Sequence, residues 1–427
     1  MIVAPLLPRL WEYFSRLGLL TFAFGYVGGL APANIGLGIL LVAFLSRCAC
    51  GERHLLRDRF VHLSMLWLVV ALALAVWGAW LFPAVGKSQF SSLPEVWSFA
   101  FIPLVALATR GNNRLILLTL LVALFGLLYR LARDVVTGVG PPDHYDGVAL
   151  GVGRNLAVLF IDVGAVGCLV LLFTLFDSPL LRGARRLVAA GLCLLALAAL
   201  LYAWVAAASR TSLVALPLAC AAIVLGRLVG GRRSTILVGL TLTVAFAVLM
   251  TTYAGRIFGE LQKDAGTWSA IAAGDWGGVP RDTATGLRFH MWHLAWDYWV
   301  QRPVTGLGPS VTHLLRSDPS RAFLAVFNQY HSGYVELLLR TGLIGVAFYL
   351  VATLRVWQVA LRARAAGRLP RGLFELLVAG FAIFVALNFT NAILFFQQGW
   401  QFVVLFGGIA YGYAWADGRP ADAEPGS

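Results

Sequence analysis

Four basic residues stand out because each falls in a short polar turn beside a long apolar run. Arg210 lies in the sequence Ser-Arg-Thr-Ser between two such runs, and Arg288 opens a tryptophan-rich segment. Arg154 precedes another apolar run, and Lys87 follows the end of one. The planar guanidinium group of arginine binds a phosphate group in two places and stays charged at any working pH. A cluster of these residues would therefore suit a diphosphate.

A histidine completes the set of candidate chemical groups. His331 lies in Asn-Gln-Tyr-His-Ser-Gly-Tyr, directly before an apolar run. Such a residue can take the proton of a hydroxyl group as its oxygen attacks, and the rate would then rise through roughly pH 6 to 7. Alternatively, His331 only makes an interfacial hydrogen bond. Contact with lipid phosphate is the alternative for the arginines and is favoured for Arg130, Arg302 and Arg340.

Metal ligands are sparse in the sequence. Asp143 and Asp146 have the closest spacing to an acidic pair, but their proline-rich surroundings favour a solvated turn. His290 and His293 stand three residues apart, which would permit a shared metal ion, yet no third ligand accompanies them. We therefore predict a reaction that needs neither a metal ion nor a cofactor.

The composition shows where these residues must be held. Of the 427 residues, 59% are hydrophobic and only 12% are charged, against about 25% charged residues in globular domains. The apolar runs are long enough to cross a bilayer, and their continuous character indicates helices and not barrel strands. The net charge of +13 is divided among short clusters between apolar runs, as topology signals are, so nucleic acid is not an expected partner.

Twelve apolar runs are candidate spans, which predicts an all-α, polytopic transmembrane bundle. They are residues 17–30, 35–46, 61–84, 96–108, 115–129, 155–176, 187–208, 212–229, 235–253, 333–356, 373–391 and 400–415. No charged leader with a cleavage site precedes the first run, so we expect no cleaved signal peptide. Arginines concentrate in alternate short loops, which predicts that these loops and both termini are cytoplasmic.

One extramembrane segment is long, and the same parity predicts that it is periplasmic. The expected organisation is spans 1–9 in residues 1–253, this loop in 254–331, spans 10–12 in 332–416 and a cytoplasmic tail in 417–427. Residues 285–301 have helical spacing that puts three tryptophans on one stripe. We interpret the stripe as packing on the ends of the spans or in the headgroup region, with sugar stacking as the alternative.

Several short motifs occur in a characteristic order along this chain. They are Gly-Arg-Asn-Leu-Ala at 153–157, Ser-Arg-Thr at 209–211, Arg288 with Trp292, Pro-Val-Thr-Gly-Leu-Gly at 303–308, His331, and Gly-Leu-Ile-Gly at 342–345. In order and spacing they resemble the superfamily of O-antigen ligases and polymerases. Ser332 stands where that family commonly has asparagine.

The resemblance implies a glycosyltransferase of the GT-C type at the periplasmic face of the bacterial inner membrane. It would take a glycan from undecaprenyl diphosphate, and it would invert the anomeric centre. Arg210 and Arg288 would bind the diphosphate and His331 would be the base, while Arg154 and Lys87 join them by position and charge alone. A ligase would use lipid A-core as the acceptor, and a polymerase would use a second lipid-linked repeat unit.

A transporter of a lipid-linked sugar remains the alternative from a different class. It would require charges along a path through the bundle. Glu336 and Arg340 form the one close pair of opposite charges within a predicted span, and at a spacing of four residues they could simply neutralise each other. The remaining candidates cluster on the predicted outer side, which favours an enzyme.

Overall fold

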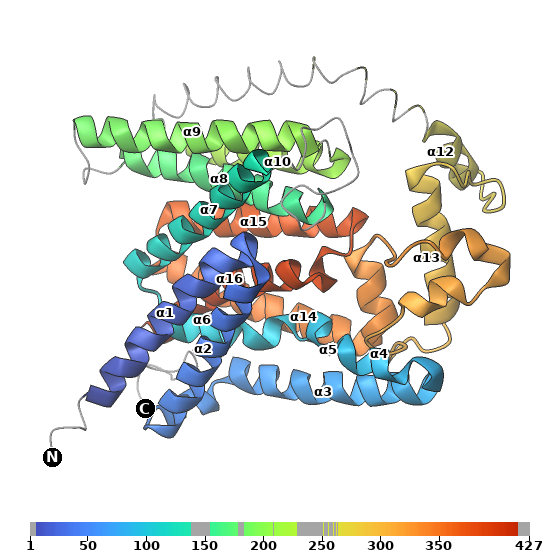
Figure 1. Ribbon diagram of the computed structural model, residues 1–427, viewed down its shortest axis with the longest axis horizontal. Helices are drawn as coiled ribbons and strands as arrows, with labels where there is room; N and C mark the ends of the chain where they lie inside the picture. The colour runs from blue at the N-terminus through green and yellow to red at the C-terminus, as the bar shows by residue number, and fades with distance from the viewer. Residues whose placement is uncertain are drawn as a thin grey trace.

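The computed structural model describes residues 6–137, 154–177, 183–207, 209–228 and 264–416, with four isolated helical positions between 251 and 262. Side chains are described for these residues except for 6–9, 154 and 155. Every regular element within the described ranges is a helix (Figure 1). The predicted all-α fold is confirmed.

Eight helices in the described part of the chain are long and apolar enough to cross a membrane. They are α2 (Leu30–Ala49), α3 (Arg59–Leu81), α7 (Asn113–Val136), α8 (Arg154–Asp177), α9 (Ala184–Ala207), α10 (Arg210–Leu228), α14 (Gly333–Ala365) and α15 (Arg371–Thr390). The protein is thus a multi-span helical membrane protein.

Three further helices correspond to predicted spans without belonging to that set. They are α1 (Leu6–Gly28), α6 (Ile102–Thr109) and α16 (Gln397–Tyr411). The predicted span 235–253 lies outside the described residues except for Thr251. The total of twelve spans stays a prediction.

Most elements of the predicted long loop gather at one end of the bundle. Helices α12 (Ala265–Ala272) and α13 (Ala284–Trp299) stand at the right of Figure 1, with α4 (Gly86–Ser91) below them in this view. The loop has its own apolar core, in which Met291 and Leu294 of α13 pack with Leu314, Tyr330 and other buried side chains. Burial of apolar side chains stabilises folding by about 25 cal/mol per Å², so this core explains why the loop is structured.

Helix α14 has a break inside it that receives part of this loop. The helix is interrupted at Gly342, where φ is 59° and ψ is −161°, a conformation that residues with a side chain rarely adopt. The interruption leaves backbone groups on both sides without partners within the helix. A Cβ atom on Gly342 would lie 2.3 Å from the carbonyl oxygen of Val304, so the loop chain approaches as closely as glycine permits.

Residues 303–308 supply those missing partners. Four hydrogen bonds run from Leu307 N to Leu339 O (2.9 Å), Gly308 N to Arg340 O (3.1 Å), Leu343 N to Pro303 O (2.9 Å) and Ile344 N to Val304 O (3.1 Å). Gly306 lies at the same contact, where a Cβ atom would be 2.6 Å from Gly342 N. The two glycine motifs of the sequence are therefore the two halves of one joint, which fixes the loop on the first part of α14.

Candidate active site

Arg210 is the first residue of α10, and its guanidinium group points toward the long loop. Its Nη1 atom lies 2.7 Å from Oδ2 of Asp264, the residue before α12. The Thr285 hydroxyl group of α13 donates to the same carboxylate oxygen at 2.7 Å. The Arg210 side chain is 41% exposed while that of Asp264 is 6% exposed. Asp264 thus holds the accessible Arg210 against the start of α13.

Arg288 lies one turn after Thr285 on α13. Burial lowers the pKa of its guanidinium group, the positive charge of Arg210 lowers it further, and Asp264 acts in the opposite direction. Its Nε atom is buried and has no hydrogen-bond partner within the described part of the chain. The guanidinium groups of Arg210 and Arg288 are thus accompanied by a single buried carboxylate, that of Asp264. The site therefore has a surplus of positive charge.

His331 has a backbone conformation that non-glycine residues rarely adopt. Its φ angle is 50°, and such left-handed residues cost of order 1–3 kcal/mol unless the surrounding structure over-determines them. On one side of His331, Trp292 Nε1 donates to the carbonyl oxygen of Tyr330 at 2.9 Å. On the other side, the N–H group of Gly333 donates to the carbonyl oxygen of Asn391 at 3.1 Å. The turn that carries His331 is therefore tied to α13 on one side and to the end of α15 on the other.

The surroundings of His331 strongly disfavour its charged form. Its pKa is lowered from 6.5 to about 4, first by burial and then by the positive charge of Arg288, while the Asn391 side chain acts in the opposite direction. Its Nδ1 atom is buried without a hydrogen-bond partner in the described residues. The imidazole is thus neutral at physiological pH, as a general base must be. The rise in rate predicted between pH 6 and 7 therefore moves to lower pH.

Ser332 explains how the chain enters α14. It is the N-cap residue, and its hydroxyl group accepts a hydrogen bond from Val335 N at 3.4 Å. Serine and asparagine are both preferred at this position because their side-chain oxygens satisfy a backbone N–H at the start of a helix. The serine that stands in place of the asparagine common in the resembling family therefore still caps the helix.

Two of the five predicted site residues are not brought into this cluster. Lys87 is exposed on α4, and none of its contacts in the described structure joins it to Arg210, Arg288 or His331. Arg154 begins α8, but its side chain lies outside the described part. Their roles stay predictions based on position and charge.

The prediction that Arg340 contacts lipid is wrong. Its side chain is only 5% exposed, with Nη2 2.7 Å from Glu336 Oε2 and Nη1 2.5 Å from Glu95 Oε2. Glu336 therefore does pair with Arg340, as their spacing allowed. Glu95 of α5 (Leu93–Val96), which follows α4, makes the pair a triad. Arg302 is exposed, and Arg130 lies 3.5 Å from Asp134 one turn further along α7.

The tryptophan stripe of α13 is divided between two environments. Trp292 is half-buried and bonds the turn before His331, whereas Trp296 is 58% exposed. Outside the stripe, Trp268 and Trp276 are also exposed, and each packs against Phe289. Packing on the protein therefore accounts for Trp292 and Trp299, whereas Trp268, Trp276 and Trp296 are exposed on the loop.

The described residues contain no group of three histidine, cysteine, aspartate or glutamate side chains that could hold a metal ion. His290 contacts Val279 O at 3.0 Å, whereas His293 stacks on Trp276, so the two histidines have separate partners. Asp143 and Asp146 lie outside the described residues. The metal-independent reaction stays a prediction.

Sequence reasoning missed two members of the site. Asp264 is 54 residues from Arg210 along the chain, and Asn391 is 60 residues from His331. Neither lies in a motif, so only the folded chain brings them to the basic residues. Asn391 could have been suspected because it is a polar residue at the end of an apolar run.

Fold and site together define the class: a multi-span helical membrane protein with a basic cluster and a neutral histidine at one end of its bundle. Within the chain, residues 194–350 match the family model described as O-antigen ligase. The matched segment runs from α9 into α14 and contains Arg210, Arg288 and His331. The resemblance predicted from the sequence is confirmed for this segment. A search of curated proteins finds no match.

Proposed function

We propose that this protein is an O-antigen ligase, which transfers a polysaccharide from undecaprenyl diphosphate to lipid A-core at the periplasmic face of the inner membrane. The observation that carries the proposal is the convergence of Arg210, Arg288 and His331. These residues come from three separate segments, yet the charge of Arg210 lowers the pKa of Arg288, and the charge of Arg288 lowers the pKa of His331. All three lie within the segment that matches the O-antigen ligase family.

The chemistry follows from the charges of these groups. An acceptor hydroxyl oxygen forms a bond to the anomeric carbon of the donor while His331 takes the hydroxyl proton. The bond between that carbon and the diphosphate oxygen breaks, and the diphosphate leaves with the electron pair. Arg210 and Arg288 stabilise the negative charge that develops on it, which is the largest single contribution in many transfer reactions. Attack on the face opposite the diphosphate inverts the anomeric centre.

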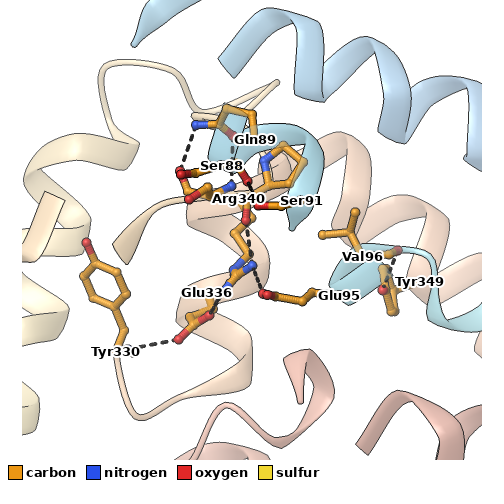
Figure 2. Close-up of polar contacts among 11 residues, drawn as sticks. Ser88, Gln89, Ser91, Glu95, Val96, Tyr330, Glu336, Arg340 and Tyr349 are labelled. Atoms are coloured by element: carbon orange, nitrogen blue, oxygen red, sulfur yellow. Dashed lines mark hydrogen bonds and ion pairs between the residues drawn. The ribbon is translucent and has the colours of Figure 1, made fainter. Parts of the chain in front are cut away.

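The arrangement favours an enzyme over a transporter of lipid-linked sugars. A transport path requires charged groups through the bundle. The one charged pair predicted within a span, Glu336 and Arg340, belongs to a triad at the loop end, near α4 and α5 (Figure 2). This placement supports recognition of a polar substrate at the membrane surface.

The decisive experiment uses purified protein in lipid nanodiscs with undecaprenyl-diphosphate-linked O-antigen as donor and lipid A-core as acceptor. We expect a product in which the polysaccharide is joined to lipid A-core, formed without ATP. His331→Ala should reduce its rate by about a hundredfold to ten-thousandfold, as loss of a general base does. If donor units are instead joined to each other, the protein is a polymerase. If neither product forms while labelled donor crosses the membrane, the enzymatic assignment is wrong.

A further inference from the structure

A polar cavity of about 220 Å³ lies beside the candidate active site. Its lining comes from the α4–α5 segment, the loop chain near residue 310, the turn before His331 and the chain after α15. The polar lining residues are Ser92, Glu95, Ser310, Thr312, Asn328, Gln329, Glu336 and Arg340, and Ala392, Phe395 and Phe396 complete the wall. Liquid water occupies about 30 Å³ per molecule, so the cavity has room for about seven waters or for one sugar ring.

Two of the charged residues in this lining are fully engaged with the protein. Arg340 donates from Nε to Glu336 at 2.9 Å and from Nη1 to Glu95 at 2.5 Å and to Pro309 O at 2.6 Å. Glu336 also accepts from the Tyr330 N–H at 3.0 Å (Figure 2). The guanidinium group and the Glu336 carboxylate therefore form the rigid floor of the site and leave little capacity for a ligand.

Other lining groups keep unused hydrogen-bonding capacity. In the described structure Glu95 uses only its Oε2 atom, and the side chains of Asn328 and Thr312 have no protein partner. The Oε1 atom of Gln329 is buried without a hydrogen-bond partner in the described chain, and a buried polar atom left unsatisfied costs about 1–3 kcal/mol. Amides, hydroxyls and a carboxylate beside phenylalanine rings are the groups that recognise a hydroxyl-rich ring with apolar faces.

The charge of the cavity limits which ring it can take. Its lining holds the two carboxylates of Glu95 and Glu336 and the single guanidinium group of Arg340. The surplus is one negative charge, and the carboxylate with free capacity is that of Glu95. A sugar that carries its own carboxylate or phosphate would meet like charge, which disfavours binding, whereas a neutral sugar or an amino sugar would not.

The cavity and His331 are held by the same two segments. Gln329 lines the cavity two residues before His331, and Ala392 lines it directly after Asn391, which interacts with the His331 side chain. Arg288, by contrast, approaches His331 from α13. The cavity therefore adjoins the turn that carries His331, and in the proposed reaction the acceptor must reach this base.

We infer that this cavity binds one neutral or amino-bearing sugar ring of the acceptor and presents its hydroxyl group to His331. This inference rests on the proposed transferase function, because only that function makes the bound sugar part of an acceptor. Recognition of the ring itself rests on the cavity alone. Gln329 and Asn328 bind hydroxyl groups, and Glu95 selects against anionic sugars.

Binding can be tested without any transfer reaction. The probes are methyl β-glucoside, methyl β-glucosaminide and methyl β-glucuronide, measured by saturation-transfer NMR with protein in nanodiscs, because sugar-headed detergents would compete. We expect the first two to bind at least about tenfold more tightly than the glucuronide, because its carboxylate would lie against the carboxylate of Glu95 and like charges disfavour binding. Equal binding of all three would overturn the assignment.

Matched variants separate recognition from folding. Glu95→Gln keeps the shape of the side chain and should reduce the preference against glucuronide to less than threefold, a change that general destabilisation would not produce. Gln329→Ala should weaken all sugars by about tenfold. The control is Glu12→Gln, which removes an exposed carboxylate paired with Arg16 on α1 and should leave every probe unchanged. An unaltered preference in Glu95→Gln would contradict the inference.

Kinetics distinguish this inference from the proposed function. In the nanodisc transfer assay, Gln329→Ala should raise the KM for lipid A-core by about tenfold and leave the KM for donor unchanged. A rise in the donor KM alone would assign the cavity to the donor glycan, and the acceptor assignment would be wrong. If the probes bind as expected but no transfer occurs, the proposed function fails and the sugar cavity stands.

Discussion

The protonation of His331 provides the sharpest test of the site. Its pKa of about 4 lies some 2.5 units below the ordinary value of 6.5, which corresponds to about 3 kcal/mol against the charged ring. At pH 5.5 an ordinary histidine is neutral in only about one molecule in ten, whereas one with a pKa near 4 is neutral in nearly all. The value of kcat/KM at pH 5.5 should therefore stay within about twofold of its value at pH 7.5.

The variant Arg288→Gln examines the cause of that shift. Removal of a nearby positive charge relieves part of the penalty on protonated His331, so the pKa should rise and kcat/KM should fall more steeply between pH 7.5 and 5.5 than in the natural protein. A bound diphosphate would neutralise Arg288 in the same way. The kcat profile, which reports the enzyme–substrate complex, should consequently rise at higher pH than the kcat/KM profile.

The measurement is the initial rate of transfer in nanodiscs at several donor concentrations and at each pH. A tenfold fall in kcat/KM between pH 7.5 and 5.5 in the natural protein would refute the reasoning, because it would mean that burial and Arg288 do not depress the titration. A profile that is the same in His331→Ala as in the natural protein would assign the titration to another group.

Four other predictions follow from the site and the joint. Arg210→Lys and Arg288→Lys should each lower kcat by tenfold or more because lysine loses the planar fork, whereas Arg302→Lys, an exposed site, should change it less than twofold. Gly342→Ala should destabilise the protein by about 3 kcal/mol or more through backbone strain and the clash with the loop. The measurement is the fall in thermal stability, and the control is Gly274→Ala, because Gly274 has a similar φ but open space around it. EDTA should leave transfer unchanged, and restoration by Mg²⁺ of a lost activity would contradict this. Gly274→Cys should react with impermeant thiol reagents from the periplasmic side, and labelling only from the cytoplasm would invalidate the predicted topology.

The chemical residues could be predicted because each lies in a recognisable local context. Arg210 stands in a turn on the predicted outer side, where the positive-inside rule gives an arginine no role. His331 lies directly before an apolar run, so sequence position alone marked both. Their partners depend on contacts between distant segments. Asp264 reaches Arg210 only after the long loop folds back on the spans, and no periodicity of the sequence encodes that return.

Arg340 shows why charge and spacing were insufficient inside the bundle. Four residues separate it from Glu336, which correctly indicated an ion pair. Whether the pair faces lipid or protein depends on what packs over it, and here the α4–α5 segment brings Glu95 from 245 residues away. In the same way, the pKa of His331 depends on burial and on Arg288, neither of which a residue type reveals.

The joint between residues 303–308 and Gly342 has a consequence for chimaeric proteins. Its four backbone hydrogen bonds depend on two chain paths that fit each other, and no side-chain identity other than glycine enters them. If the loop were replaced by that of another protein up to residue 331, residues 303–308 would be lost while Gly342 stayed. Each half of the joint would then pack against a segment from a different protein. A transplant that ends beyond Ile344 would carry both paths together, with the turn of His331 between them.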